Sequence, residues 1–326
     1  MTALINNNDQ NQAGISCLSA LCKAAGDELR LQILRVLQRD AFGVLELAKM
    51  FGIRQPAMSH HLKVLAKAAL VVTRKEGTHI FYRRNINDGS ELALLREQIF
   101  TQLDTCELPS EVLDEVALIH EHRSNTSKNF FKLNAQEFRQ QQDLIASFSL
   151  YGDAVLELLE TERQKGAKSV LEIGPGEGEL LAALVPRFEQ VIALDNSSAM
   201  LERAEALVGK ELASSIHFIL GETNSQAAVE TAVDCTTLNM VLHHVATPVD
   251  MLKDIYELLN PGGALIVTEL CQHDQDWVRD TCGDLWLGFC PEELSIWARE
   301  IGFKTGESVY MAQRNGFKIQ LRKFHK

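Results

Sequence analysis

Residues 170–181 of the chain read VLEIGPGEGELL, and this stretch indicates both the fold and the ligand class of the second half. An apolar run ends at Glu172, glycines follow at positions 174, 176 and 178, and a new apolar pattern begins. Glycine has no Cβ, so it tolerates positive φ angles and lets backbone amides approach a ligand closely. A dinucleotide fingerprint would need its third glycine at 179, where Glu179 stands. The loop therefore departs from that fingerprint but still predicts a nucleotide-like ligand.

The residues around this loop alternate between strand and helix patterns from about position 166 onward. Strands are expected in five segments: 169–174, 190–195, 215–221, 232–242 and 262–270. Helical patterns such as MLERAEALVG (200–209) and DMLKDIYELLN (250–260) separate them. This alternation predicts a doubly wound, Rossmann-like α/β sheet, whose ligand lies at the carboxyl ends of the strands.

The glycine loop and its preceding acid resemble those of class I S-adenosylmethionine-dependent methyltransferases, and the resemblance covers about 166–326. It implies that the cofactor or ligand is S-adenosylmethionine or S-adenosylhomocysteine. It also implies a role for each site residue. Glu172 would bind the amino group of the methionine part, and Asp195 would accept both ribose hydroxyls as a bidentate acceptor. Glu222 would contact the adenine. The remaining implied contacts come from Gly174, Gly176, Gly178 and Asn239.

About a hundred residues upstream, RQPAMSHHLKVLAKAALV (54–71) has the pattern of a DNA-reading helix. Pro56 suits a first helical turn, and Gly52, four residues earlier, is expected to cap the preceding short helix. Met58, Leu62, Leu65 and Ala69 recur at helical spacing and form the expected buried stripe. The opposite face is small, polar and basic, as a helix that enters the major groove requires. The DNA contacts expected from this helix are Gln55, Ser59, His60, Lys63 and Lys67.

The segment LVVTRKEGTHIFYRR (70–84) alternates and turns at Glu76-Gly77, which predicts a two-stranded wing. Arg74, Lys75 and Arg83 would lay positive charge along a DNA backbone or minor groove. The distribution of charge along the chain agrees with DNA binding by the N-terminal part. Residues 1–105 carry 13 Lys/Arg and 10 Asp/Glu, whereas residues 106–326 carry 19 and 34, within a net charge of −12. The first part is therefore expected to meet phosphate, and the second is not.

Residues 15–100 resemble the winged-helix domain of ArsR-type bacterial regulators, with SHHLKVL (59–65) as the most specific piece. The resemblance implies a homodimer that binds operator double-stranded DNA. The segment GVLELAKMF (43–51) has no cysteine and ELALLREQIFTQLD (91–104) has no histidine, so soft-metal sensing at the usual sites is not expected. The stripe of Leu92, Leu95, Ile99 and Leu103 could pack within the domain. By resemblance, a dimer seam shared with the helix near residues 17–26 is favoured.

The bulk properties predict a cytoplasmic protein of two folded domains joined by a helical connector. Domain bounds are expected at 1–105 for the α+β winged helix–turn–helix, 106–165 for the connector and 166–326 for the ligand-binding domain. The first residues are polar, and no run of 18 apolar residues occurs, so neither a signal peptide nor a membrane span is expected. The seven scattered cysteines predict buried thiols rather than disulfides, and no metal site is expected. His120 and His122 are interpreted as residues of an exposed helix face.

Three functions remain open at this point. The favoured one is a transcriptional repressor that senses S-adenosylhomocysteine or S-adenosylmethionine, because the fusion looks like the adenosylhomocysteine-responsive regulators of the bacterial methionine cycle. A second is an active small-molecule methyltransferase with an autoregulatory winged helix. His243 and His244 could then offer a base, although packing and capping roles are favoured, and Cys271, Cys282 and Cys290 could trap arsenic for methylation. A third is a DNA-binding protein whose second domain is only a scaffold.

Overall fold

The computed structural model describes residues 2–76, 79–86, 92–134 and 138–326, which form two compact units. The first unit covers Met1–His120 and the second covers Glu121–Lys326. The boundary falls inside one helix, α6, rather than in a loop. None of the described helices has the length and apolar character that crossing a membrane would need.

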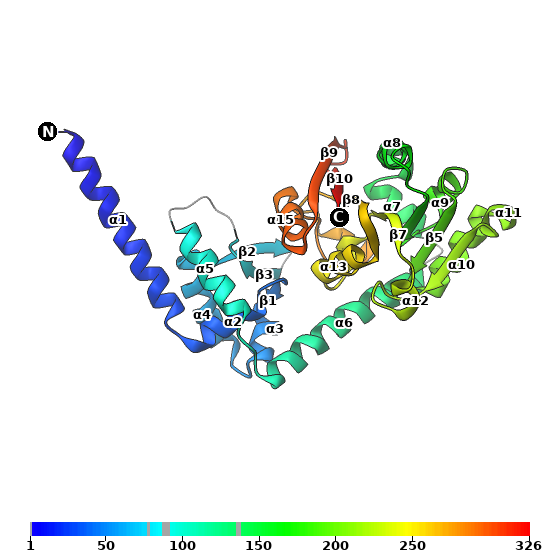
Figure 1. Ribbon diagram of the computed structural model, residues 1–326. Coiled ribbons are helices and arrows are strands. Elements are labelled where there is room, and N and C mark those ends of the chain that lie inside the picture. Colours follow the sequence, from blue (N-terminus) through cyan, green and yellow to red (C-terminus); the bar gives the residue numbers. More distant parts are fainter. Residues whose placement is uncertain (1, 77–78, 87–91, 135–137) are drawn as a thin grey trace. The chain divides into compact units, whose positions relative to one another are not determined.

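The first unit is a winged helix–turn–helix (Figure 1). Its strands form a three-stranded antiparallel sheet in the order β1-β3-β2. Its elements, in chain order, are α1 (Thr2–Ala25), α2 (Glu28–Val36), β1 (Phe42–Gly43), α3 (Val44–Met50), α4 (Gln55–Lys67), β2 (Val71–Glu76), β3 (His79–Arg84), α5 (Ala93–Asp104) and the first part of α6 (Ser110–Asn134). The wing is confirmed, whereas β1 was not anticipated because two residues leave no alternating pattern. The turn expected at Gly77 lies outside the described residues.

The expected DNA-reading helix is α4, and its local sequence explains where it begins and ends. Arg54 is the N-cap and Pro56 lies in the first turn, where its missing N–H costs no hydrogen bond. Met58, Leu62 and Leu65 are fully buried, as expected. Ala69 is not part of this helical stripe, because the helix ends at Lys67 and Ala69 adopts a φ of +52°. Gly52 has a φ of +61° directly after α3, consistent with the predicted cap.

The core of the first unit also contains the start of α6. Val112 and Ile119 of that helix are buried in one cluster with residues of α1 to α5. His120 is not simply exposed, because its ring stacks on Phe42 with centroids 5.7 Å apart and its Nε2 lies 3.4 Å from Asp40 Oδ2. The first half of α6, up to His120, is therefore a structural part of the DNA-binding unit.

Helix α5 buries most of the expected stripe, because Leu103 is buried and Leu92 and Ile99 pack against the same core, whereas Leu95 of the stripe is exposed. Arg96, Phe100 and Leu103 are buried within the chain, whereas Leu94 is 75% exposed and Leu95 is 38% exposed. On α1, Ile15 and Leu18 are also exposed. Both α1 and α5 therefore keep apolar side chains in solvent in the single chain.

The second unit is built on a seven-stranded sheet in the order β6-β5-β4-β7-β8-β10-β9, flanked by helices (Figure 1). Strands β6, β5, β4, β7 and β8 are parallel, and β10 and β9 add an antiparallel edge. After the end of α6, its elements are α7 (Phe138–Ile145), α8 (Phe148–Gln164), β4 (Ser169–Ile173), α9 (Glu179–Leu184), β5 (Gln190–Asp195), α10 (Ser198–Val208), α11 (Lys210–Ala213), β6 (Ile216–Leu220), α12 (Gln226–Val229), β7 (Val233–Asn239), η1 (Leu242–His244), α13 (Pro248–Leu258), β8 (Leu259–Leu270), α14 (Trp277–Cys282), α15 (Pro291–Ile301), β9 (Lys304–Ala312) and β10 (Lys318–His325). The five predicted strands and the doubly wound architecture are confirmed.

Helices α7 and α8, expected in a separate connector, belong to the second unit. Ile145, Tyr151 and Val155 are buried in the same core as the sheet. A buried ion pair ties α8 to the sheet, because Lys323 Nζ of β10 lies 3.0 Å from Glu162 Oε1 of α8. The same ammonium donates to Thr161 Oγ1 at 3.0 Å and lies 2.9 Å from Glu307 Oε1. The described residues of 106–165 therefore divide between the two compact units, which meet between His120 and Glu121.

The cysteines differ in part from the expectation of buried thiols. All seven are free, but three of them are exposed, namely Cys17, Cys22 and Cys106. Cys235, Cys271 and Cys282 are buried, and Cys290 is half-buried.

The Lys323 cluster gives a stability prediction. Glu162→Ala leaves a fully buried ammonium with one carboxylate fewer, so the free energy of unfolding should fall by about 3 kcal/mol. Urea denaturation of the full chain measures this. Glu160→Ala is the matched control on the same helix, because Glu160 pairs with Arg163 in solvent and its loss should change little. An equal loss in both variants would contradict a stabilising role for the buried pair.

Candidate ligand cleft and DNA-binding face

The carboxyl ends of β4, β5 and β7 open into one cleft with an empty volume of about 970 Å³. Six of the seven residues predicted to bind the adenosyl ligand line it: Glu172, Gly174, Gly176, Asp195, Glu222 and Asn239. Gly178 does not. It caps α9 with a φ of +78°, and a Cβ there would lie 2.8 Å from Val208 Cγ2. Gly178 is therefore needed for the approach of α9 to α10 rather than for ligand contact.

Gly174 shows why the loop requires glycine. Its φ is +64°, and a Cβ would lie 2.7 Å from Val241 Cγ2, closer than real Cβ contacts. Its N–H donates to the Leu194 carbonyl at 2.8 Å, which joins the loop to the end of β5. Gly176 also has a positive φ, of +56°. At positions 174 and 176 the loop thus presents backbone, rather than side chains, to the cleft.

Glu172 lies at the base of the cleft, and the pKa of its carboxyl is raised. It is 3% exposed, and within the described part of the chain its Oε2 accepts no hydrogen bond. Burial raises the pKa of this carboxyl to about 8, and the nearby Asn239 amide offsets only part of that rise. A buried carboxyl oxygen facing a cleft and lacking a donor is suited to an ammonium ligand.

Asp195 and Glu222 form the second polar edge of the cleft. Burial raises the pKa of Asp195 to about 6, although its Oδ1 accepts the Ser197 N–H at 2.8 Å. The group is still ionised at neutral pH and can accept from hydroxyl donors. Glu222 Oε1 accepts from the Asn196 amide at 3.2 Å and lies 2.7 Å from Lys128 Nζ of α6.

The other wall of the cleft comes from helices that carry no functional signal in their sequence. Ser127 and Phe131 of α6, Gln142 of α7, and Phe148 and Tyr151 of α8 line it. Apolar and amide residues on helices are ordinary packing residues, so only the fold reveals their position. This wall makes the cleft apolar on one side, which suits a nucleoside or thioether.

Two loop carboxylates, also not singled out by the sequence, are held by arginines. Glu177 is buried, and its Oε1 accepts from Arg203 Nε of α10 at 2.7 Å. Arg139 of α7 lies 3.5 Å from Glu177 Oε2 and donates to Glu179 Oε1 at 3.0 Å. These pairs fix the glycine loop between α7 and α10.

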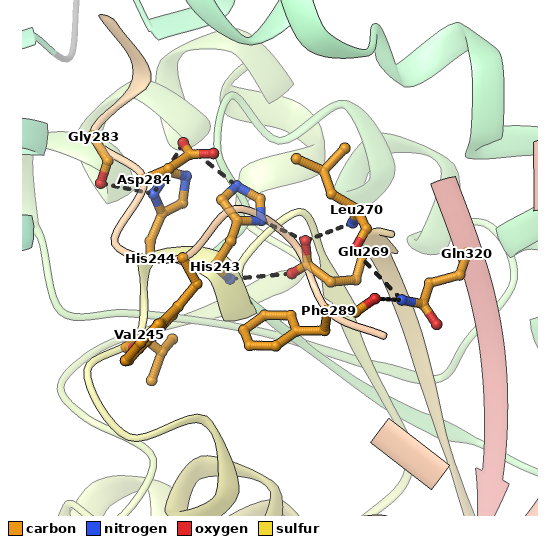
Figure 2. Close-up of polar contacts among 10 residues, drawn as sticks. His243, His244, Val245, Glu269, Leu270, Gly283, Asp284, Phe289 and Gln320 are labelled. Atoms are coloured by element: carbon orange, nitrogen blue, oxygen red, sulfur yellow. Dashed lines mark hydrogen bonds and ion pairs between the residues drawn. The ribbon is translucent and has the colours of Figure 1, made fainter. Parts of the chain in front are cut away.

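His243 lies behind the cleft in a buried polar cluster, between Glu269 and Asp284 (Figure 2). Its Nδ1 is 2.6 Å from Glu269 Oε1, and its backbone N–H donates to Glu269 Oε2 at 3.2 Å. Burial lowers the pKa of His243, but the two carboxylates outweigh it and raise that pKa to about 9. The backbone carbonyl of His243 also accepts the N–H groups of Leu285 and Trp286. The cluster therefore joins the η1 loop to residues 283–286.

His244 is the neighbour that reaches the cleft. Its Nδ1 is 3.2 Å from the Gly283 carbonyl, so Nδ1 carries the proton and Nε2 is the acceptor (Figure 2). Burial, with the adjacent His243, lowers its pKa well below the usual value, so the ring is neutral at pH 7.

Among the described residues, the ligand atoms of His243, His244 and Asp284 lie within 4.8 Å of one another. In the described part of the chain, the three cysteines considered for arsenic do not form a group of three close ligand atoms. Cys282 Sγ donates to the Gln141 carbonyl at 3.6 Å and Cys290 Sγ to Glu292 Oε2 at 2.7 Å.

The DNA-binding candidates fall into two groups. Gln55, His60, Lys63 and Lys67 of α4 and Lys75 of β2 are exposed, and Ser59 and Arg83 are half-exposed. Arg74 differs, because it is only 4% exposed. Successive strand residues point to opposite sides, so Lys75 faces solvent and Arg74 faces the protein. The structure thus removes Arg74 from the exposed face.

Residues 135–319, more than half of the chain, match the model of a family described as a methyltransferase domain. The chain belongs to this family. Residues 25–74 match a second model, described as a helix-turn-helix domain. The protein is thus an ArsR-type helix–turn–helix domain fused to a methyltransferase domain, as the sequence resemblances predicted.

Relatives of each half support this description. The tRNA 5-carboxymethoxyuridine methyltransferase of Escherichia coli K12 is 36% identical over 98 residues, which are 29% of this chain and 38% of that enzyme. The chain thus spans well under half of the length of this relative. An uncharacterized HTH-type transcriptional regulator of Methanocaldococcus jannaschii is 44% identical over 61 residues, 18% of this chain and 68% of that protein.

The arsenical resistance operon repressor of Staphylococcus aureus is 38% identical over 68 residues, 21% of this chain and 65% of that protein. Among solved structures, magnesium protoporphyrin IX methyltransferase from Synechocystis with bound S-adenosylhomocysteine covers 63% of this chain and 99% of its own, with 15% identity and a TM-score of 0.48.

The proton affinity of Glu172 predicts a pH-dependent ligand affinity. An ammonium-bearing adenosyl ligand favours the carboxylate form, so its binding should release a proton below the pKa of about 8. The affinity for S-adenosylhomocysteine should then rise between pH 6 and 8, by up to about tenfold per pH unit. Calorimetric titrations at three pH values measure this.

The matched ligand is 5′-methylthioadenosine, which lacks the amino-acid part. It still depends on Asp195 but should show a flatter profile, and Glu172→Gln should flatten the profile for S-adenosylhomocysteine. Identical pH profiles for the two ligands would contradict the assignment of Glu172 to the ammonium.

Proposed function

We propose that the protein is a homodimeric transcriptional repressor whose methyltransferase-type domain senses S-adenosylhomocysteine or S-adenosylmethionine, and that it controls genes of the methionine and S-adenosylmethionine cycle. The observation that carries the proposal is the cleft. It is lined by the buried Glu172, whose Oε2 accepts no hydrogen bond from the described residues, by glycines 174 and 176 with positive φ, and by Asp195. The same chain carries a helix–turn–helix with an exposed polar face on α4. The match to a methyltransferase-domain family supports an adenosyl ligand in this cleft.

The residues of the cleft suit the parts of that ligand. Glu172 would accept from the ammonium, backbone amides around Gly174 and Gly176 would face the ribose and amino-acid parts, and Asp195 would accept both ribose hydroxyls. Glu222 would contact the adenine and Asn239 the methionine side. A Cβ at Gly174 would collide with Val241, which also lines the cleft, so the loop can take this position only with glycine there.

The DNA-binding side rests on the exposed face of α4 and on the wing. Gln55, Ser59 and His60 lie at the amino-terminal end of α4, where a recognition helix contacts base edges. Lys63, Lys67, Lys75 and Arg83 would meet phosphates. Arg74 has no part in this proposal, because it is buried.

The homodimer is proposed from the ArsR-type resemblance and from the exposed apolar residues of α1 and α5. Leu94 and Leu95 on α5, and Ile15 and Leu18 on α1, face solvent in the single chain. A partner chain that covered them would remove apolar surface from water, which favours association. The dimer would then present two recognition helices, one for each half-site of an operator.

Sensing needs only a ligand whose affinity differs between two states of the protein, and no chemical step. S-adenosylmethionine carries a positive sulfonium, whereas the sulfur of S-adenosylhomocysteine is neutral. The ratio of the two compounds reports methylation demand, so a repressor of the cycle that regenerates them has a use for either one as signal.

A second candidate is an active small-molecule methyltransferase with an autoregulatory winged helix. The observation in its favour is His244, whose neutral ring lines the cleft with Nε2 as acceptor and could take a proton from a methyl acceptor. Arsenite as substrate has less support, because Cys282 and Cys290 bond to separate partners. Transfer of a labelled methyl group to a small-molecule acceptor, lost in His244→Ala, would favour this candidate.

The pocket assignment predicts the effect of one substitution on the ligand response. Asp195→Ala removes charge-assisted hydrogen bonds to the ribose and should weaken S-adenosylhomocysteine binding by about 10- to 100-fold. Operator affinity without ligand should stay unchanged, while the ligand response at moderate concentrations disappears. Calorimetry and gel retardation measure the two. Asp153→Ala, at an exposed position of α8, should change neither. An intact response in Asp195→Ala would refute the pocket assignment.

A substitution on the DNA-binding face should weaken operator binding without changing ligand binding. Lys63→Ala removes one phosphate contact, so operator affinity should fall for all sequences and the salt slope of binding should decrease by about 1. Affinity for S-adenosylhomocysteine should not change. Lys168→Ala, an exposed lysine of the second unit, is the charge-matched control and should leave the salt slope as it is. Equal slopes in the two variants would exclude Lys63 from the interface.

A further inference from the structure

Helix α6 runs from Ser110 to Asn134 without interruption (Figure 1), and the boundary between the two units falls between its residues 120 and 121. An α-helix rises about 1.5 Å per residue, so its 25 residues extend over roughly 37 Å. Each half of the helix makes its own set of contacts within its own unit.

The first half contacts the elements that present the DNA-binding face. Glu115 Oε2 lies 2.9 Å from Lys49 Nζ of α3, the helix that precedes the reading helix α4. His120 stacks on Phe42 of β1, and Phe42 pairs in register with Tyr82 of the wing strand β3. Val112 and Ile119 are buried in the same core. A shift of this half of α6 would therefore move side chains packed against both α3 and the wing sheet.

The second half contacts the residues assigned to the ligand. Lys128 Nζ lies 2.7 Å from Glu222 Oε1, the carboxylate assigned to the adenine. Phe131 lines the cleft and meets the edge of His244 with ring centroids 4.8 Å apart. Phe130 packs against Gly283, where an added Cβ would clash with its ring. A ligand that bonds to Glu222 and fills the space beside Phe131 must therefore change the contacts made by this half of α6.

We propose that α6 couples occupancy of the adenosyl cleft to operator affinity, with its second half as the part that responds to ligand and its first half as part of the DNA-binding core. This inference rests on the proposed function and adds the route by which ligand and DNA influence each other. Glu222 exchanges Lys128 for the ligand, and the continuous helix carries the resulting displacement into the packing of α3 and β1. Coupling is reciprocal, so operator DNA changes ligand affinity by the same factor as ligand changes operator affinity.

The decisive test weakens the helix at the boundary without removing a packed side chain. Glu121 and His122 are exposed, and replacing both by glycine costs roughly 1 kcal/mol of helix propensity each, whereas replacing both by alanine keeps the helix. In the unaltered protein, S-adenosylhomocysteine should shift the operator Kd by a factor in the typical allosteric range, about 5- to 150-fold. E121G/H122G should reduce this factor toward 1, and E121A/H122A should keep it. Fluorescence anisotropy with operator DNA measures the factor, and calorimetry measures the ligand affinity without DNA.

A second arm tests the contact with Glu222. Lys128→Ala removes the competing ammonium, so affinity for S-adenosylhomocysteine without DNA should stay the same or rise, while the ligand-induced shift in operator Kd shrinks. Lys132→Ala, an exposed lysine one turn further along α6, should behave as the unaltered protein does.

The outcomes separate the two proposals. A full ligand-induced shift in E121G/H122G, with both affinities intact, would overturn the role of α6 and leave the sensor proposal standing. No ligand effect on operator Kd in the unaltered protein, despite ligand binding, would overturn the sensor proposal and the coupling with it. Loss of apo operator binding or ligand binding in E121G/H122G would show instead that α6 supports the folding of that unit, and the Lys128→Ala arm then decides.

Discussion

The second unit depends on a single steric constraint at the end of its first strand. Gly174 turns the chain with a positive φ, at a point where Val241 leaves no room for a Cβ. This approach sets the loop after β4 against the loop after β7, while the N–H of Gly174 joins the same loop to β5. Three strand ends are thereby held around one cavity, and Glu172, Asp195 and Asn239 lie at those ends. The position of each polar group follows from the packing of the glycine loop rather than from contacts among the polar groups themselves.

The two halves of helix α6 are held by contacts of different chemical kinds. Its first half is held by a buried apolar core and by a ring stack, and its second half by an ion pair and aromatic edges. Apolar packing has no partner that a small nucleoside could displace. An exposed ion pair such as Lys128–Glu222 is worth little and exchanges easily. The half of the helix near the cleft is therefore the one whose contacts a ligand can change.

Local patterns in the sequence were sufficient where one short segment carries the constraint. The G-x-G-x-G loop, the Pro56-started helix and the five parallel strands follow from glycine, proline and hydrophobic periodicity, and all are present. The sequence was insufficient where distant residues must meet. Strand β10 reads as charged in RKFHK, yet Lys323 is buried because Glu162 and Glu307 reach it from α8 and β9. Arg74 looked like a DNA contact because it is basic, and only the pairing register of the wing shows that it faces inward. The helical wall of the cleft was missed for the same reason, since Phe131 and Phe148 have the pattern of ordinary core residues.

The strand order has a consequence for how the chain reaches this fold during synthesis. Strand β9 precedes β10 in the sequence but lies at the sheet edge, and β10 lies between β8 and β9. On the ribosome, β9 therefore emerges before β10, with which it pairs in the described structure. It lacks these hydrogen bonds until His325 and its neighbours have been added. Until then β8 is an open edge, a surface on which nascent chains associate wrongly. The winged helix can fold well before that moment, so newly made molecules pass through a stage with a complete DNA-binding unit and an unfinished sheet.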